Sequence, residues 1–494
     1  MIMRRILLML VAFGGAMAAN AAEYVTEIEL LKGEKWWGLD FYGRLEQPLN
    51  GSVGEPEKMA GQTRVEPYRS IMVSNAGRYI YSEKPLKKVE FGDETITITS
   101  EYEKIEVEKG GKTLREAYVV CALKNLAPGH SPALEMFAMP QYLMDGDFAY
   151  MSEDVVLGYA EKLLAEGFPP GIIVVDDGWQ KVSGPYGFDP ELFPDPKGMV
   201  DKLHELGFKI MLTITPNVPN WGSVYGMARD NNQIINWALE KSPVTLDIGN
   251  DEQFSRLRSG LEKIKDVYGF DGFCFDWQED VPPDSVKFIT NMMSLGEGVD
   301  MACYRKVIDR PYASYLGCIW HMQDNEDFSP LITKAITAGL MGYPYATARL
   351  DPSGERQMAD YLLLQCGMPV LSVDFAPWRI TDHDLYEKVK EAVNFRASIG
   401  DYVSKLAADS RRTGEPIVRH MEYQFPKSGF FDCDDQFMLG SQYLFAPCVD
   451  GADQRLVRFP KGTWLGRNGE KIKGPVVKQV DCSAGELIVF EAAR

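Results

Sequence analysis

The chain has 494 residues, which is long enough for two or three domains, and its 45% hydrophobic and 25% charged residues are typical of a globular protein. A formal net charge of −19 disfavours a nucleic-acid partner, because the surface would repel a polyanion. The sequence contains no GxSxG, GxGxxG or Walker motif, and Phe208 stands where a zinc motif HExxH begun at His204 needs its second histidine. Carboxylates are therefore the plentiful reactive groups.

Residues 1–22 have the pattern of a secretory signal peptide. Arg4 and Arg5 precede the apolar run ILLMLVAFGGAMA, and Ala19-Asn20-Ala21 forms a cleavage site of the A-x-A type. A membrane anchor is the alternative, but this run is short for a bilayer and no later segment is apolar for long enough. The sequence thus predicts export to the periplasm or the extracellular space, with no membrane attachment after signal cleavage.

Residues 23–135 are predicted to form an antiparallel β-sandwich. The segment 94–111 alternates apolar and polar residues and then reaches a Gly-Gly turn, and the segment 73–85 has the same style. After the central part of the chain, short strands separated by Pro and Gly return, as in DQFMLGSQYLFAP and RLVRFPKGTW. Residues 396–494 are therefore predicted to form a C-terminal β-domain.

Between these regions, residues 136–395 alternate apolar strands with amphipathic helices. Helical spacing is seen in 152–171, with Ser152 as the N-cap, and in 197–208, 252–270 and 354–366. Eight strands are expected at GIIVVDDGW (171–179), KIMLTITP (209–216), VTLDIGN (244–250), DGFCFD (271–276), DMACYRKV (300–307), YLGCIW (315–320), GYPYATARLD (342–351) and GMPVLSVDFAP (367–377). Eight strand–helix units indicate an α/β protein with a (β/α)8 TIM barrel, and a doubly wound sheet is the alternative.

Acidic residues follow several of these strands. They are Asp176, Asp177, Asp276, Asp324 and Asp374. In a barrel the strand ends meet at one face, where the chemistry gathers. Carboxylates that share a pocket divide into an ionised and a protonated group, which is the arrangement that glycoside hydrolysis requires. For any single aspartate, a helix N-cap or a solvated loop is the alternative.

Several blocks of sequence carry a family resemblance. They are IIVVDDGWQ and FPDPKGMVDKLHELGFKIMLTITP within 172–216, DGFCFDWQED (271–280), DRPYASYLGCIWHMQDN (309–325), SPLITKAITAGLMGYP (329–344) and, further on, TGEPIVRHMEYQFP. In their order and spacing these blocks resemble glycoside hydrolase family 31, the retaining α-glycosidases, over most of the chain. The resemblance implies that the protein is a retaining α-glycosidase acting on an oligosaccharide or glycoside, and the signal peptide adds the expectation that it is exported.

The resemblance also implies roles for individual residues. Asp276 would be the nucleophile, and Asp324 would be the acid that protonates the leaving oxygen and then activates water. Arg310 would bind the same sugar and help to keep Asp276 ionised, and Asp176 or its neighbour Asp177 would hold sugar hydroxyls. Asp374 lies about where the α-glucosidases have a histidine. The candidates for stacking on sugar faces are Trp277 and Trp320, with Trp179 and Trp221, and ordinary packing is the alternative for each.

Some positions depart from the family pattern, which argues against an ordinary α-glucosidase specificity. They are Cys274 in place of a common Lys, Gln278 and Gln323 in place of Gly, and Arg349 about where an Asp is usual. A non-catalytic carbohydrate-binding relative and a transglycosylase are the alternative functions. No cofactor or metal is predicted, although a structural calcium ion stays open. The sugar, its linkage, the disulfide pairing and the oligomeric state stay open as well. For Cys274 and Cys366, a buried free thiol is expected.

Overall fold

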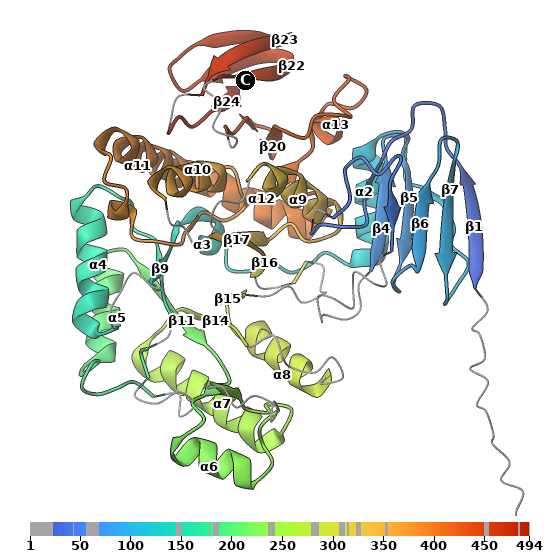
Figure 1. The fold of residues 1–494 in the computed structure, drawn as a ribbon. Coiled ribbons are helices and arrows are strands. Elements are labelled where there is room, and N and C mark those ends of the chain that lie inside the picture. The colour runs from blue at the N-terminus through green and yellow to red at the C-terminus, as the bar shows by residue number, and fades with distance from the viewer. Residues whose placement is uncertain are drawn as a thin grey trace, which may run out of the picture.

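The protein has three parts, described from a computed structural model (Figure 1). The structure describes residues 23–42, 44–55, 69–144, 151–176, 178–180, 187–235, 243–277, 286–305, 312–313, 316–322, 328–350, 354–448, 454–482 and 485–493. For residues 317–322 and 350 the description covers the backbone. An N-terminal pair of sheets packs beside a barrel, and a C-terminal sheet lies at the top of the view in Figure 1.

The N-terminal part is a sandwich of two four-stranded antiparallel sheets. One sheet has the order β1-β7-β6-β3, with β1 at Tyr24–Glu29, β7 at Thr95–Ser100, β6 at Lys88–Phe91 and β3 at Val53–Gly54. The other has the order β2-β4-β5-β8, with β2 at Trp36–Gly38, β4 at Ser70–Ser74, β5 at Arg78–Ser82 and β8 at Glu108–Lys109. Alternate residues such as Ile96 and Ile98 point into a shared core, which explains their alternating pattern. The helix α2 (Leu114–Cys121) follows the sandwich and is capped by Thr113.

The central part is the expected (β/α)8 barrel. Its eight parallel strands have the order β17-β16-β15-β14-β11-β10-β9-β18, and β18 and β17 lie together at the closing seam. The strands are β9 (Gln141–Met144), β10 (Ile172–Val175), β11 (Lys209–Ile214), β14 (Gly272–Phe275), β15 (Met301–Tyr304), β16 (Leu316–Met322), β17 (Ala346–Leu350) and β18 (Ser372–Val373). All four residues of β10 are buried, as expected for a strand covered on both faces.

Helices cover the outside of the barrel. They are α4 (Glu153–Ala165), α5 (Pro196–Glu205), α7 (Asp251–Lys263), α8 (Val286–Glu297), α9 (Ser329–Leu340), α10 (Glu355–Gln365) and α11 (His383–Ser398). The Ser152 hydroxyl accepts a hydrogen bond from the Val155 N–H, which confirms it as the N-cap of α4. The predicted helices therefore lie close to their expected bounds.

One predicted barrel strand is wrong. The segment VTLDIGN contributes β13 (Val244–Thr245), which pairs antiparallel with β12 (Asn217–Val218) outside the barrel. Together with α6 (Gly222–Asp230) these short strands enclose a small apolar cluster after β11. The missing barrel strand is β9, whose four residues all pair with β10 and whose first two also pair with β18. The number of strands was right because one error offset the other.

The C-terminal part begins with helices and ends in a six-stranded sheet. The helix α12 (Gly400–Thr413) follows α11 and precedes α13 (Met421–Gln424). The sheet has the order β19-β20-β21-β24-β22-β23, with strands at Val418–Arg419, Phe437–Leu439, Tyr443–Phe445, Val489–Ala492, Gln454–Gly466 and Lys471–Asp481. A separate apolar core that includes Trp464 supports this sheet.

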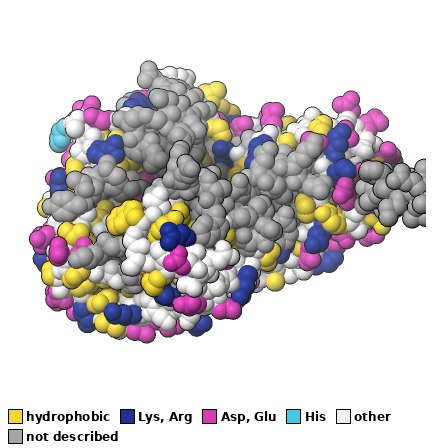
Figure 2. All heavy atoms as spheres, turned by 60° about the horizontal axis from the view of Figure 1, so that its bottom comes forward, with side chains coloured by type: hydrophobic (Ala, Val, Ile, Leu, Met, Phe, Trp, Pro, Cys, Tyr) yellow, Lys and Arg dark blue, Asp and Glu magenta, His cyan; other side chains and the backbone are white. Residues whose placement is uncertain are grey.

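Two disulfide bonds are present, and one corrects a prediction. Cys274, expected to be a free thiol, is bonded to Cys303 on the neighbouring barrel strand. Cys448 is bonded to Cys482 in the C-terminal sheet. Cys366 is buried and free, as predicted. Among the described residues, no helix combines the length and apolarity needed to cross a bilayer. Acidic and basic side chains intermingle on the face in Figure 2, and no broad basic patch is visible among its described residues.

Candidate active site

Three charged side chains stand immediately after neighbouring or near-neighbouring barrel strands. Asp176 follows β10, Asp276 follows β14 and Arg305 follows β15. Each is held by a backbone hydrogen bond to the adjacent strand: Asp176 N–H donates to Met144 O at 3.1 Å, Asp276 N–H to Ile214 O at 3.0 Å, and Arg305 N–H to Phe275 O at 3.0 Å. The strand ladder therefore continues to the residues that carry the charges.

The Arg305 guanidinium joins the two acids. Its Nη2 forms an ion pair with Asp176 Oδ1 and donates to Thr213 Oγ1 at 3.3 Å, while its Nη1 lies 3.6 Å from Asp276 Oδ2. The planar fork of arginine suits this arrangement, since its nitrogens can serve separate acceptors at fixed angles. The side chains of Arg305 and Asp176 are 12% and 6% exposed, whereas that of Asp276 is 26% exposed. Asp276 is thus the most accessible member of the group.

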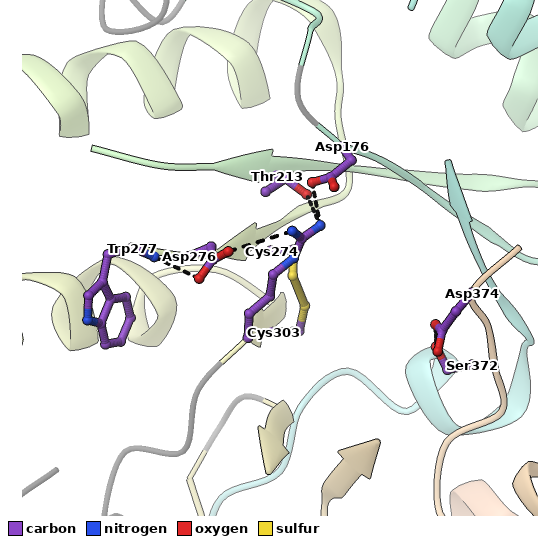
Figure 3. The surroundings of a disulfide bond; sticks show 9 residues. Asp176, Thr213, Cys274, Asp276, Trp277, Cys303, Ser372 and Asp374 are labelled. Carbon is purple, nitrogen blue, oxygen red and sulfur yellow. Dashed lines mark hydrogen bonds and ion pairs between the residues drawn. A yellow bond between two sulfur atoms is a disulfide. The ribbon is translucent and has the colours of Figure 1, made fainter. Parts of the chain in front are cut away.

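The second oxygen of Asp276 is also fixed. Trp277 N–H donates to Asp276 Oδ1 at 2.8 Å, as the dashed line in Figure 3 shows. The Trp277 ring is buried and meets the rings of Phe288 and Tyr304 edge-on, with centroids 6.4 and 6.3 Å away. Trp277 therefore helps to hold the carboxylate through its backbone, and a contact between its ring and a sugar stays a prediction.

Asp374 is placed opposite this group, after β18 (Figure 3). It is buried, and the Tyr361 hydroxyl donates to its Oδ2 at 2.6 Å. The Ser372 hydroxyl donates to its Oδ1. Since a buried carboxylate is costly unless hydrogen bonds satisfy it, these donors explain how Asp374 is accommodated in the barrel.

A cavity in the barrel interior lies between the two sides. Arg305 and Asp374 line it, together with Arg349, Thr347 and Ser372. Its apolar lining includes Leu143, Val174 and Leu316, and the disulfide cysteines Cys274 and Cys303 also line it. Of the group that Arg305 joins, Arg305 itself lines this cavity, whereas Asp176 and Asp276 are not among its lining residues.

The other predicted site residues are placed as follows. Asp177, Arg310 and Asp324 lie outside the described residues, as does the side chain of Trp320, whose backbone belongs to β16. The separation between Asp276 and Asp324 therefore stays a prediction. Trp179 is fully buried and its indole N–H donates to Thr213 O at 3.1 Å. Its ring therefore packs in the protein interior, which was the alternative to stacking on a sugar. Trp221 is 64% exposed at the start of α6.

Arg305, Thr213 and Tyr361 were not predicted as site residues. Arg305 lay inside the predicted strand 300–307, whereas β15 ends at Tyr304, so its place at the strand end was not visible in the sequence. Thr213 is the penultimate residue of β11, whose apolar neighbours gave no hint of a polar role, and Tyr361 lies within the helix α10. Among the described residues, no three His, Cys, Asp or Glu side chains converge on a point where a metal ion could bind.

Comparison with known proteins agrees with this architecture. A family profile described as "Glycosyl hydrolases family 31 TIM-barrel domain" matches residues 137–348, and one described as "Glycosyl hydrolase family 31 C-terminal domain" matches residues 414–491. A myogenesis-regulating glycosidase of Mus musculus is 23% identical over 407 residues, which are 71% of this chain and 55% of that protein. The chain thus spans about half the length of this relative.

Solved structures share the fold. An α-xylosidase from a soil metagenome, complexed with xylose, is 19% identical with a TM-score of 0.75, and the match covers 95% of this chain and 79% of that one. A dextranase of Flavobacterium johnsoniae, complexed with glucose, is 17% identical with a TM-score of 0.76, and the match covers 96% and 67% of the two chains. The two family profiles, which together match more than half of the chain, confirm the predicted resemblance: the chain belongs to glycoside hydrolase family 31.

Proposed function

We propose that the protein is an exported retaining α-glycosidase that hydrolyses terminal α-glycosidic bonds of oligosaccharides or glycosides, with Asp276 as the nucleophile. The placement of Asp276 carries the proposal. It stands at the carboxyl end of the fourth barrel strand, with one oxygen hydrogen-bonded to the Trp277 N–H and the other beside Arg305. Both contacts are those of an ionised carboxylate, which is the form that attacks an anomeric carbon.

The proposed reaction has two displacements. Asp276 attacks the anomeric carbon while a second carboxylic acid, for which we propose Asp324, gives its proton to the departing oxygen. The same residue, now ionised, then takes a proton from water, whose oxygen attacks the anomeric carbon and releases Asp276. Two inversions at one carbon leave the product in the α configuration of the substrate.

The remaining charged groups are proposed to orient the sugar. Arg305 fixes Asp176 and Asp276 relative to each other, so a sugar hydroxyl that binds Asp176 is placed at a defined distance from the nucleophile. Asp374 reaches the cavity from the opposite side and can accept hydrogen bonds from further hydroxyls. Among the related structures, one enzyme holds xylose and another holds glucose, so pentoses and hexoses are both candidate substrates.

The nucleophile is tested with 4-nitrophenyl α-glycosides of xylose, glucose and galactose. We expect Asp276→Ala to lower kcat by at least about 10³-fold, because the covalent intermediate can no longer form. Added azide should restore turnover and yield the β-glycosyl azide, since it attacks from the vacated side. The exposed Asp230 supplies the control, in Asp230→Asn. Wild-type rates in Asp276→Ala would exclude this residue as the nucleophile.

A covalent label and the product configuration complete the test. An α-configured cyclitol epoxide should add to Asp276, and mass spectrometry of the peptide that contains it should locate the added mass. NMR of the first-formed sugar should show the α anomer. Binding of every glycoside without cleavage would instead support a carbohydrate-binding relative. For export, the N-terminal sequence of secreted protein should begin near residue 22 or 23.

A further inference from the structure

The Cys274–Cys303 disulfide joins the two strands that carry Asp276 and Arg305. Cys274 on β14 and Cys303 on β15 are direct partners in the parallel register, and their Cα atoms are 4.6 Å apart. Both cysteines line the barrel cavity. Figure 3 shows the disulfide close to Asp276. The disulfide therefore lies in the barrel interior, beside the candidate site, and not on the protein surface.

The position of the bond in each strand matters because side chains alternate along a strand. Asp276 lies two residues after Cys274, and Arg305 lies two residues after Cys303, so each charged group is on the same strand face as its cysteine. The ladder between the strands is registered as far as Phe275 and Tyr304, and the Arg305 N–H then donates to Phe275 O. The disulfide is thus the covalent link nearest to the ion pair.

The outer faces of these strand ends are secured by other contacts. The ring of Tyr304 stacks on that of Phe275 with centroids 5.1 Å apart. Its hydroxyl donates to Met292 O at 2.6 Å and accepts from the Gly296 N–H at 3.0 Å, which ties β15 to α8. These contacts fix the side facing the helices. The inner side, where the charged groups stand, is fixed across β14 and β15 by the disulfide.

We propose that the Cys274–Cys303 disulfide is a positioning element of the active site. It fixes the distance between Asp276 and Arg305, and this inference rests on the proposed function of Asp276 as the nucleophile. Hydrogen bonds at a strand end open and close, whereas the sulfur–sulfur bond holds both strands at one spacing. A displacement of about 1 Å at a reacting group can cost about 10²-fold in rate, so a covalent link here has a direct effect on glycosyl transfer.

The second disulfide provides a matched control. Cys448 follows β21 and Cys482 follows β23, so their bond closes a loop of the C-terminal sheet away from the barrel cavity. Its sequence separation of 34 residues is close to the 29 residues between Cys274 and Cys303, so removing either bond frees a loop of similar length in the unfolded chain. The two double variants should therefore differ mainly in what each bond does in the folded state.

The test compares Cys274→Ser/Cys303→Ser with Cys448→Ser/Cys482→Ser in the full chain. The probe is an α-configured cyclitol epoxide, with labelling of Asp276 followed by mass spectrometry. We expect the labelling rate constant of the first variant at saturating probe to be at least about tenfold lower than that of the wild type. The probe concentration that gives half of the maximal rate should change by less than about threefold. The labelling rate constant of the second variant should stay within about twofold of the wild-type value. Peptide mapping of the active wild type should show the Cys274–Cys303 bond.

Hydrogen exchange provides a measurement that does not depend on turnover. Amides of residues 275–277 and 304–305 should exchange faster in the Cys274→Ser/Cys303→Ser variant than in the control, while those of β10 keep their wild-type protection. Labelling at the wild-type rate, free thiols in the active protein, or unchanged exchange at these amides would each overturn the proposal. If the wild type neither labels nor cleaves any glycoside, the proposed function fails, and exchange alone decides whether the bond positions the pair.

Discussion

Arg305 Nη1 lies 3.6 Å from Asp276 Oδ2, although the two residues come from different strands and are 29 positions apart in the chain. The same guanidinium forms an ion pair with Asp176, and both partners in that pair are largely buried. One cation thus connects two of the acids that were predicted at the strand ends. The nucleophile proposed here is held by a neighbour that sequence reasoning did not select.

This bridge predicts different effects for two substitutions of Arg305. A lysine keeps the charge but has a single ammonium group, which cannot serve Asp176 and Asp276 at the same time. We expect Arg305→Lys to lower kcat/KM by about 10- to 100-fold and Arg305→Gln to lower it further, because glutamine also removes the positive charge that Arg305 places between the two carboxylates. Steady-state kinetics on the most reactive 4-nitrophenyl glycoside measure both effects.

The control for these variants is Arg229→Lys. Arg229 also pairs with an aspartate, Asp230, but both side chains are more than half exposed on α6. Exposed ion pairs contribute little to stability, so this change should leave both activity and stability close to wild type. An Arg305→Lys enzyme with wild-type kcat/KM would show that the bridge has no part in the reaction.

The barrel and its acidic strand ends were predictable because they depend on local patterns. Four buried apolar residues in β10, followed at once by an aspartate, mark both a strand and its carboxyl end. The strand β9 also ends before an aspartate, Asp145, but its apolar run is only the three residues after Gln141, which is weaker than the four apolar residues of β10. Val244–Thr245 looked like a strand and is one, but its partner lies outside the barrel.

Local sequence patterns could not predict which side chains of different strands contact one another. Cys274 and Cys303 pair because β14 and β15 are neighbours in register, a fact set by the closing of the whole barrel. The same holds for Arg305, whose partners Asp176 and Thr213 are about 90 to 130 positions away in the chain. Composition identifies a residue as apolar or charged, whereas its contact partner depends on which strands the fold places side by side.

The hydrogen bond from Tyr361 to Asp374 gives a second prediction, on stability. Tyr361→Phe removes the hydroxyl that donates to the buried Asp374 Oδ2, whereas the Ser372 hydroxyl, which donates to Oδ1, is kept. We expect the free energy of unfolding to fall by about 1–2 kcal/mol, because a buried acceptor loses its partner. Urea unfolding followed by circular dichroism measures the change.

Tyr386→Phe is the matched control for Tyr361→Phe. The Tyr386 hydroxyl donates to Glu166 at 3.1 Å, and Glu166 is exposed, so water can replace the lost donor. Its removal should change the free energy of unfolding by no more than about 0.5 kcal/mol. Equal effects of the two substitutions would mean that the buried hydrogen bond to Asp374 stabilises the protein no more than the exposed hydrogen bond to Glu166 does.

A third prediction concerns pH and the buried His420. Burial lowers the pKa of His420 from 6.5 to about 4; the charge of Arg458 also lowers this pKa, and that of Asp432 raises it. Its Nδ1 accepts a hydrogen bond from the Glu422 N–H at 3.1 Å, and its ring packs against Trp37. The nearby Glu422 is also buried, and burial raises the pKa of its carboxyl group.

The sign of the effect follows from which state binds the proton. Between pH 6.5 and about 4 the unfolded histidine is protonated while the folded one is neutral, so the free energy of unfolding falls as the pH falls through this window. The full loss amounts to roughly 3 kcal/mol. Above pH 6.5 both states are neutral and His420 adds no pH dependence. Glu422 acts in the opposite direction, since its raised pKa favours the folded state at lower pH.

His420→Asn isolates the histidine, because asparagine keeps an acceptor for the Glu422 N–H but does not titrate. Urea unfolding of both proteins from about pH 7 to about pH 5 should show a steeper loss of stability in the wild type. The contribution of Glu422 is common to both proteins and cancels in the difference. Parallel stability curves would show that His420 is protonated in the folded state as readily as in the unfolded one.

Two tryptophans that were both candidates for sugar stacking give the last prediction. Trp179 is fully buried, packs on Phe188 with ring centroids 5.0 Å apart, and donates to Thr213 O, whereas Trp221 is 64% exposed. Trp179→Ala should lower the free energy of unfolding by about 3–5 kcal/mol through cavity formation, and Trp221→Ala should change it by less than about 0.5 kcal/mol. Urea unfolding of the two variants provides the comparison.

The link from Trp179 to Thr213 extends this prediction to activity. Thr213 Oγ1 accepts a hydrogen bond from Arg305, so the backbone that Trp179 holds also supports the cation of the candidate site. Trp179→Phe keeps an aromatic ring but removes the indole N–H. We expect it to lower kcat several-fold at a cost in stability of about 1–2 kcal/mol. If kcat stays at the wild-type value while stability falls, Trp179 serves packing alone, and the position of Arg305 does not depend on this hydrogen bond.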